Sequence, residues 1–195
     1  ADYRLLEGDV LRVPPMRVAD RSMKDKAGTT RRERATAFEI VFEDDDLVVI
    51  DKPAGIAVHG GSGISFGVIE QLRMARPDAR MLELVHRLDR DTSGLLMIAK
   101  KRSALVKLHD DLREGLVKKR YLALASGPWP EAKRQVKVPL VKFTLSGGER
   151  RVRAAVKDEA GGMLAYTIFH RLENFDGREG AFSLLDVDLK TGRTT

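Results

Sequence analysis

The side chains most suited to chemistry in this sequence lie together between residues 86 and 94. They bring one imidazole, two guanidinium groups, two carboxylates and two hydroxyls into nine residues, with Leu88 as the only large apolar side chain. A carboxylate flanked by arginines is a candidate nucleophile or base, because a nearby positive charge lowers the pKa of a carboxyl group and keeps it ionised. Asp89 holds this position and is the candidate catalytic residue. The full segment is His86, Arg87, Leu88, Asp89, Arg90, Asp91, Thr92, Ser93 and Gly94.

The same residues also fit a purely structural role. Arg87, Asp89, Arg90 and Asp91 could form an ion-pair cluster that closes a turn, while the two hydroxyls bond to backbone amides. The residue types alone do not choose between the two interpretations.

Reactive groups usually lie on loops that a rigid scaffold positions, so the flanking elements matter. Apolar side chains at helical spacing predict one helix within residues 66–74. They predict a second within residues 103–112, with Ser103 as its N-cap. Two β-branched runs separated by an acidic turn predict a hairpin over residues 40–50. The segment at 86–94 therefore lies between a helix and a strand.

Strands outnumber helices in the sequence. Several follow one another without an intervening helix, so the βαβ alternation of a doubly wound parallel sheet is absent. The sequence therefore predicts an α+β fold with a mixed, mainly antiparallel sheet and a few flanking helices. The further strands expected are residues 95–99, 121–125, 136–141, 152–156, 164–172 and 181–189.

Composition favours a polyanionic partner and excludes several kinds of site. The formal net charge is +6, and eight basic residues lie between residues 133 and 157 against the single acid Glu149. Such clustering is typical of a phosphate-binding surface, although a solvated face is the alternative. There is no cysteine, which excludes disulfides, thiolate metal sites and cysteine nucleophiles. Residues 60–63 lack the Gly-Lys-Ser/Thr ending of a nucleotide-binding loop, so no nucleotide cofactor is expected.

The segment at 86–94 matches the His-Arg-Leu-Asp-x-x-Thr-Ser-Gly signature of the RluA-type RNA pseudouridine synthases residue for residue. Residues 51–55, 119–124 and 189–194 resemble three other motifs of this family, in the same order along the chain. The residues around 59–63 resemble bacterial members that act on large-subunit ribosomal RNA. The resemblance covers residues 38 to 195.

This resemblance implies roles for four residues. Asp89 would be the catalytic aspartate, Arg87 would fill the space left by a uridine flipped out of the RNA, and Tyr121 would stack on the extruded base. Arg193, in a Thr-Gly-Arg turn, could contact RNA phosphate or support the active-site loop, and we expect RNA contact. Without the resemblance, Tyr121 is better explained as an ordinary strand residue. The family chemistry implies no metal and no cofactor, and His86 is expected to position neighbouring groups and not to carry a proton.

The resemblance also implies an organisation in domains. Residues 1–16 would be the tail of an upstream RNA-binding domain, residues 17–36 a basic linker, and residues 37–195 the pseudouridine synthase catalytic domain. The family continues its last motif with His-Gln-Ile-Arg, whose arginine pairs with the catalytic aspartate, whereas this sequence stops at Thr195. We therefore expect truncation at both ends, with the C-terminal part of the catalytic domain missing. The absence of a long apolar run and of a signal peptide predicts a cytoplasmic protein without a membrane partner.

The predicted function is the isomerisation of specific uridines in RNA, with large-subunit ribosomal RNA as the expected partner. The main alternative is a non-catalytic RNA-binding fragment, because a basic domain without its final motif can still hold RNA. A second alternative is hydrolysis of a nucleoside bond, since exclusion of water alone separates rejoining from hydrolysis.

Overall fold

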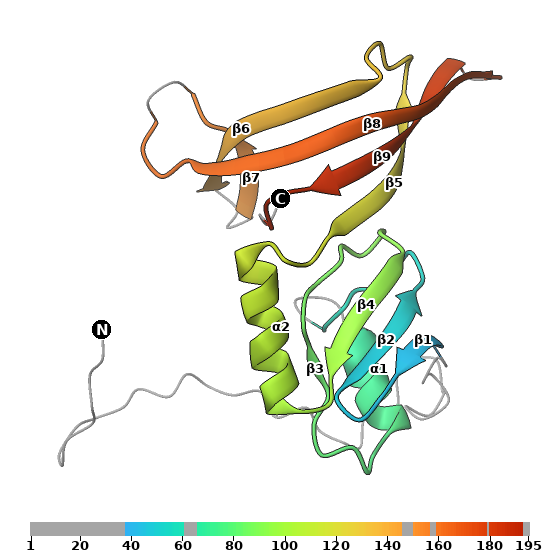
Figure 1. Ribbon diagram of the computed structural model, residues 1–195, viewed down its shortest axis with the longest axis vertical. Coiled ribbons are helices and arrows are strands. Elements are labelled where there is room, and N and C mark those ends of the chain that lie inside the picture. Colours follow the sequence, from blue (N-terminus) through green and yellow to red (C-terminus); the bar gives the residue numbers. More distant parts are fainter. Residues whose placement is uncertain (1–37, 61–65, 146–149, 157–158, 179, 193–195) are drawn as a thin grey trace.

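A computed structural model of the chain describes residues 38–192 apart from residues 61–65, 146–149, 157–158 and 179. The described residues form two parts that lie one above the other, each built on its own antiparallel sheet (Figure 1). The expected upstream tail at 1–16 and the expected linker at 17–36 lie outside the described residues.

The first sheet has four strands in the order β1-β2-β4-β3, and all of its pairs are antiparallel. The expected hairpin at 40–50 is confirmed. The Asp44 carboxylate closes its turn by accepting hydrogen bonds from the N–H groups of Asp46 and Leu47, at 2.8 and 2.7 Å. The sequence did not predict β3, which is too short to carry a pattern. The strands are β1 (Glu39–Glu43), β2 (Leu47–Lys52), β3 (Glu83–Leu84) and β4 (Gly94–Ala99).

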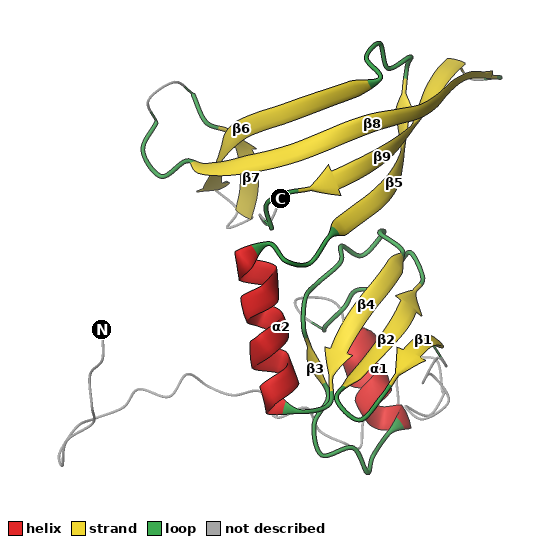
Figure 2. Ribbon diagram, in the orientation of Figure 1, coloured by secondary structure: helices red, strands yellow, loops and turns green. Residues whose placement is uncertain are grey.

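The two expected helices are confirmed, and they cover opposite faces of this sheet (Figure 2). Side chains alternate between the two faces of a strand. The buried side chains of α1 (Val68–Ala75) accordingly pack with Val48 of β2, and Leu105 of α2 (Arg102–Glu114) packs with Ala99 of β4. The prediction of Ser103 as N-cap was wrong. The N-cap of α2 is Lys101, which makes no capping side-chain hydrogen bond.

Gly67, directly before α1, brings this helix against the loop that follows β2. A Cβ added at Gly67 would lie 2.5 Å from backbone atoms of His59. The Glu70 carboxylate fixes the same approach by accepting hydrogen bonds from the N–H groups of Gly60 and Gly67, at 3.1 and 2.9 Å. The loop and the helix are therefore in close backbone contact.

We expect Gly67→Ala to lower the free energy of unfolding by about 2 kcal/mol, because the backbone must move to admit the methyl group. Urea titration measures the loss. The matched control is Gly55→Ala, where the added Cβ meets open space and only the positive φ of 85° adds strain. That strain costs about 1 kcal/mol. Equal losses at the two positions would contradict the steric explanation.

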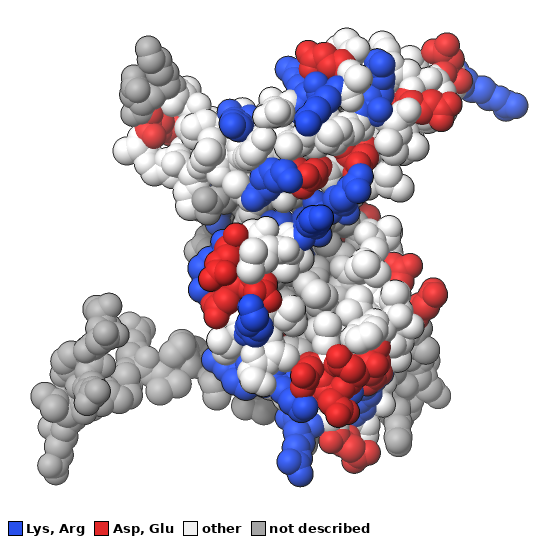
Figure 3. All heavy atoms as spheres, viewed as in Figure 1, with Lys and Arg blue, Asp and Glu red and all other residues white. Residues whose placement is uncertain are grey.

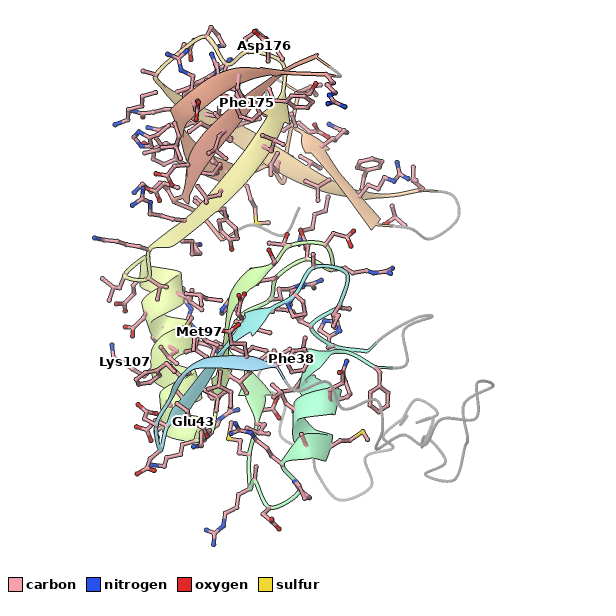
Figure 4. All side chains as sticks on the ribbon, turned by 90° about the vertical axis from the view of Figure 1, so that its right-hand side faces the viewer. Phe38, Glu43, Met97, Lys107, Phe175 and Asp176 are labelled. Atoms are coloured by element: carbon pink, nitrogen blue, oxygen red, sulfur yellow. The ribbon has the colours of Figure 1, made fainter. Side chains whose placement is uncertain are left out.

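The second sheet has five strands in the order β5-β9-β8-β6-β7, again with antiparallel pairs throughout. In β5, half-buried residues alternate with exposed ones, so that Lys119 and Tyr121 share the more buried face. Figure 4 labels Phe175 and Asp176 of β8 in this part and Met97 of β4 in the part below. The strands are β5 (Lys119–Ser126), β6 (Lys133–Thr144), β7 (Arg150–Ala154), β8 (Met163–Gly177) and β9 (Gly180–Leu189).

The predicted α+β fold class is confirmed. The strands divide between two sheets, and every strand pair of the described residues is antiparallel. Hydrophobic periodicity identifies a strand but does not say which strand it pairs with, so this division was not predicted. In the part of the chain that the structure describes, no helix is long and apolar enough to cross a membrane.

Candidate active site

A pocket of about 550 Å³ lies where the two parts meet. Its lining comes from three segments: the 86–94 loop, the end of α2 together with the start of β5, and the end of β9 with the turn after it. Figure 1 shows α2 leading into β5 at this junction, with the end of β9 close by. The lining residues whose side chains are charged or aromatic are His86, Arg87, Asp89, Arg113, Lys119 and Tyr121.

Leu88 anchors the 86–94 loop. Its side chain is 6% exposed and belongs to the apolar core of the first part. Arg87 and Asp89, on either side of it, are exposed and line the pocket. The backbone then turns, and the carbonyl of Asp89 accepts a hydrogen bond from the N–H of Thr92 at 3.2 Å. One apolar anchor thus holds the two polar neighbours at the pocket.

Arg90 ties this loop to the loop that follows β2. Its backbone carbonyl accepts hydrogen bonds from the N–H of Gly55 at 2.9 Å and from the ammonium of Lys52 at 3.0 Å. Its side-chain Nε donates to the carbonyl of Gly55 at 3.1 Å. Gly55 has a φ of 85°, in the region that favours glycine. The motif at residues 51–55 that was noted in the sequence therefore supports the loop that carries Asp89.

Lys52 is a buried cation that helps to hold the 86–94 loop in place. Its side chain is fully buried, and the carboxylates of Asp89 and Asp91 lie within electrostatic reach. Burial lowers the pKa of Lys52, and the two negative charges act in the opposite direction. Its ammonium donates three hydrogen bonds, to the carbonyls of Pro53 (2.8 Å), Ile56 (2.9 Å) and Arg90 (3.0 Å). A positive charge is therefore fixed beneath the 86–94 loop.

The expectation that the charges of the loop arginines favour the ionised form of Asp89 stays a prediction. Within the described residues, no ion pair joins Asp89 or Asp91 to Arg87 or Arg90. Arg90 bonds to Gly55, and Arg87 lines the pocket. The structural alternative, an ion-pair cluster that closes the turn, is not formed either.

His86 has the environment of a positioning residue. Its Nε2 accepts a hydrogen bond from the N–H of Met97 at 3.2 Å, so this nitrogen carries no proton. Burial lowers the pKa of His86, although a hydrogen bond with the backbone of Arg87 acts in the opposite direction. A neutral ring held between two backbone groups supports the interpretation that His86 fixes the loop.

Tyr121 lies on the opposite side of the pocket, on β5. The half-buried ring packs against the core of the first part. Burial raises the pKa of Tyr121, and the negative charge of Asp89 raises it further. The phenol therefore stays protonated at neutral pH, and its ring lies within electrostatic reach of Asp89.

The pocket brings together three of the four residues predicted as the site: Arg87, Asp89 and Tyr121. The fourth, Arg193, lies outside the described residues. Two further cations line the pocket and were not predicted, Arg113 of α2 and Lys119 of β5. The period of two along a strand could have identified Lys119, because it lies two residues before Tyr121.

The basic stretch at 133–157 lies elsewhere. Its described residues belong mainly to β6 and β7, and β9 and β8 separate these strands from β5. Figure 3 shows basic side chains spread over the five-stranded sheet and down to its junction with the part below. The stretch is therefore a second basic region, apart from the pocket.

Comparisons with known proteins agree with this geometry. A family described as "RNA pseudouridylate synthase" matches residues 46–195. Among curated relatives, "Ribosomal large subunit pseudouridine synthase C" of Pasteurella multocida (strain Pm70) is 55% identical over 154 residues, which is 79% of this chain and 47% of the relative. The protein of the same name from Escherichia coli (strain K12) is 54% identical, over 79% of this chain and 48% of the relative. That from Yersinia pestis is 49% identical over 99% of this chain and 58% of the relative.

Solved structures share the fold. The structure titled "Human RNA Pseudouridylate Synthase Domain Containing 1" superimposes with a TM-score of 0.68 at 22% identity, covering 82% of this chain and 62% of that one. The chain spans about half the length of the first two bacterial relatives named above. With a family match over most of its residues, the chain belongs to the RNA pseudouridylate synthase family.

Proposed function

We propose that the protein isomerises uridine to pseudouridine in RNA, with Asp89 as its catalytic residue and large-subunit ribosomal RNA as its substrate. The observation that carries the proposal is one pocket that holds an exposed carboxylate, a tyrosine ring and three cations. The names of the bacterial relatives support ribosomal RNA as the substrate. A cytoplasmic location, where such RNA is made in bacteria, belongs to the same proposal.

The reaction breaks the bond between the ribose and nitrogen 1 of uracil, turns the base and joins it again through carbon 5. The Asp89 carboxylate acts at the ribose in one of two ways. It attacks the anomeric carbon, as the nucleophile of a retaining glycosidase does, or it removes a ribose proton to give a glycal-like intermediate. Both routes require a carboxylate that the substrate can reach, which fits the exposed position of Asp89.

The uridine must leave its stack to enter the pocket. Flipping a base out costs on the order of a few kcal/mol and is easiest in loops. Arg87 is exposed beside Asp89 and is the side chain to occupy the vacated space. Tyr121 offers a flat face to the extruded base, because stacking holds a ring while allowing it to rotate. We assign RNA contact to Arg193 on its position directly after Gly192, which lines the pocket.

The test incubates the natural, full-length protein and the chain 1–195 with unmodified large-subunit ribosomal RNA. Pseudouridines are mapped by carbodiimide adducts and reverse-transcription stops. Stops made by wild type but absent with Asp89→Asn support the proposal. RNA binding without any stops would favour a binding module, and release of free uracil would favour a hydrolase.

We propose the basic strands β6 and β7 as a region that binds RNA phosphates. Lys133 and Lys137 share one face of β6 because they lie four residues apart on a strand. We expect the double variant Lys133→Gln, Lys137→Gln to weaken RNA binding and to flatten its salt dependence, because fewer counterions are released. Each lost phosphate contact reduces the slope of log K against log salt by about 0.7 to 0.9.

Filter binding at several salt concentrations measures this slope. Lys107→Gln is the control, because Lys107 lies on α2 and pairs with Asp111 at 2.5 Å. If the double variant kept the wild-type slope, these two lysines of β6 would not be part of the RNA-binding surface.

A further inference from the structure

Lys119 is a half-buried cation of the pocket. It begins β5 and is half-buried on the same strand face as Tyr121. A Cβ added at Gly192 would lie 3.2 Å from its Nζ, so the ammonium reaches the pocket lining formed by the turn after β9. Lys119 therefore presents its charge inside the pocket and not to bulk water.

Within the described residues, Lys119 Nζ makes no hydrogen bond or ion pair. Asp188, whose charge acts on Lys119, pairs with Lys190 at 2.5 Å. The exposed neighbour Arg120 pairs with Asp186 on the other face. Burial lowers the pKa of Lys119, which reflects the unfavourable setting of its charge. A half-buried cation held without a partner in a pocket is typical of a group that awaits an anionic ligand.

The proposed reaction creates such an anion. When the bond between the ribose carbon and nitrogen 1 breaks, its electron pair stays with uracil, whether Asp89 forms a bond to the ribose or removes a ribose proton. The negative charge spreads over nitrogen 1 and the two carbonyl oxygens of the ring. The free base rejoins through carbon 5, whose proton is lost while nitrogen 1 gains one, so the isomerisation balances without a co-reactant.

We propose that Lys119 stabilises the uracil anion that forms when the glycosidic bond breaks, and so holds the base in the pocket while it rotates. This inference rests on the proposed function. Lys119 and Tyr121 line the pocket from the same strand face, so the ammonium is available to the carbonyl oxygens of a base stacked on Tyr121. A fixed cation aimed at charge that develops in the transition state accelerates its formation, and the effect is larger in a pocket than in water.

The test compares Lys119→Met and Lys119→Arg in the natural, full-length protein by single-turnover conversion of RNA. We expect Lys119→Met to slow conversion of uridine by about 100-fold, the usual effect of removing one group that stabilises a developing anion. RNA affinity should change by less than about threefold, since the interaction arises in the transition state. Lys119→Arg keeps the charge and should retain more than about a tenth of the rate. Lys118→Met, at the exposed neighbouring position, is the matched control and should keep the wild-type rate.

A substrate with a better leaving group separates this role from a structural one. Fluorine at carbon 5 stabilises the uracil anion, so RNA with 5-fluorouridine needs less help from Lys119. We expect the defect of Lys119→Met in consuming this nucleotide to shrink to about 10-fold. The wild-type rate on uridine should also fall as pH rises through the lowered pKa of Lys119, because the ammonium then loses its proton. This fall should be absent in Lys119→Arg.

Equal defects on the two substrates, or a loss explained by RNA affinity, would overturn the inference. If Lys119→Met fails to fold, the dependence of the rate on pH in wild type and in Lys119→Arg still tests the role of Lys119. Identical pH dependence in the two proteins would overturn the inference. Failure of the proposed function looks different, because wild type itself would then convert no uridine.

Discussion

Asp89→Asn is expected to abolish pseudouridine formation and to leave RNA binding nearly intact. The amide has almost the shape of the carboxylate but is a poor nucleophile and a poor base. The Asp89 side chain is exposed, and Leu88 and Arg90 anchor the loop, so the substitution leaves the fold in place. Loss of a central nucleophile or base lowers turnover by at least about three orders of magnitude.

Single-turnover conversion and filter binding on the same RNA measure the two quantities. The matched control is Asp91→Asn, because Asp91 is an exposed carboxylate of the same loop that does not line the pocket. This control should keep most of the activity. Residual activity of Asp89→Asn above about a tenth of wild type would remove Asp89 from the catalytic role.

Lys52→Met is expected to have the largest effect on stability. Methionine fills a similar volume, but the carbonyls of Pro53 and Ile56 lose the ammonium that they bond. The two carbonyls are partly buried, and each unsatisfied group costs about 1 kcal/mol or more, so the free energy of unfolding should fall by about 2 to 3 kcal/mol. The carbonyl of Arg90 keeps only its bond from Gly55, so the loop that carries Asp89 is less firmly held and conversion of uridine should slow as well.

Urea unfolding of wild type and variant measures the stability change. Lys101→Met is the control, because Lys101 is 54% exposed and pairs with Asp46 at the surface. Exposed ion pairs contribute little to stability, so this control should stay close to wild type. If Lys52→Met unfolded at the wild-type urea concentration, the buried hydrogen bonds would not be what fixes the loop.

The sequence predicts local structure well in this protein because its patterns are strong. The hairpin at 40–50 combines two β-branched runs with an acidic turn, and helix α2 carries apolar residues at helical spacing. Both follow from interactions between near neighbours in the chain. The helix start was placed wrongly because Ser103 is a good cap by residue type, whereas the backbone becomes helical without any side-chain cap.

In the candidate site, too, local motifs identify some residues, whereas their arrangement in space was not predicted. Asp89 is identified by a dense local motif, and Tyr121 by a second short motif. Their position in one pocket depends on the packing of β5 against the first part and on its pairing with β9, and no local pattern contains that information. Besides the neighbouring arginines, Lys52 brings a positive charge within electrostatic reach of Asp89. It is 37 residues away in sequence and meets the loop only through the folded sheet. Lys119 shares a strand face with Tyr121, but its place in the pocket follows from the same distant pairing.

The pairing of β5 with β9 also has a consequence for the order of folding. Lys119 lies opposite Leu189, so closing this pair joins residues 70 positions apart, whereas β1 and β2 are joined by a short turn. Contacts between distant residues form slowly, because the chain must lose more entropy to bring them together. During synthesis the four-stranded sheet and the loop with Asp89 can form before β9 has left the ribosome. The Asp89 carboxylate is then in place early, and the pairing of β9 with β5 completes the pocket as a later step.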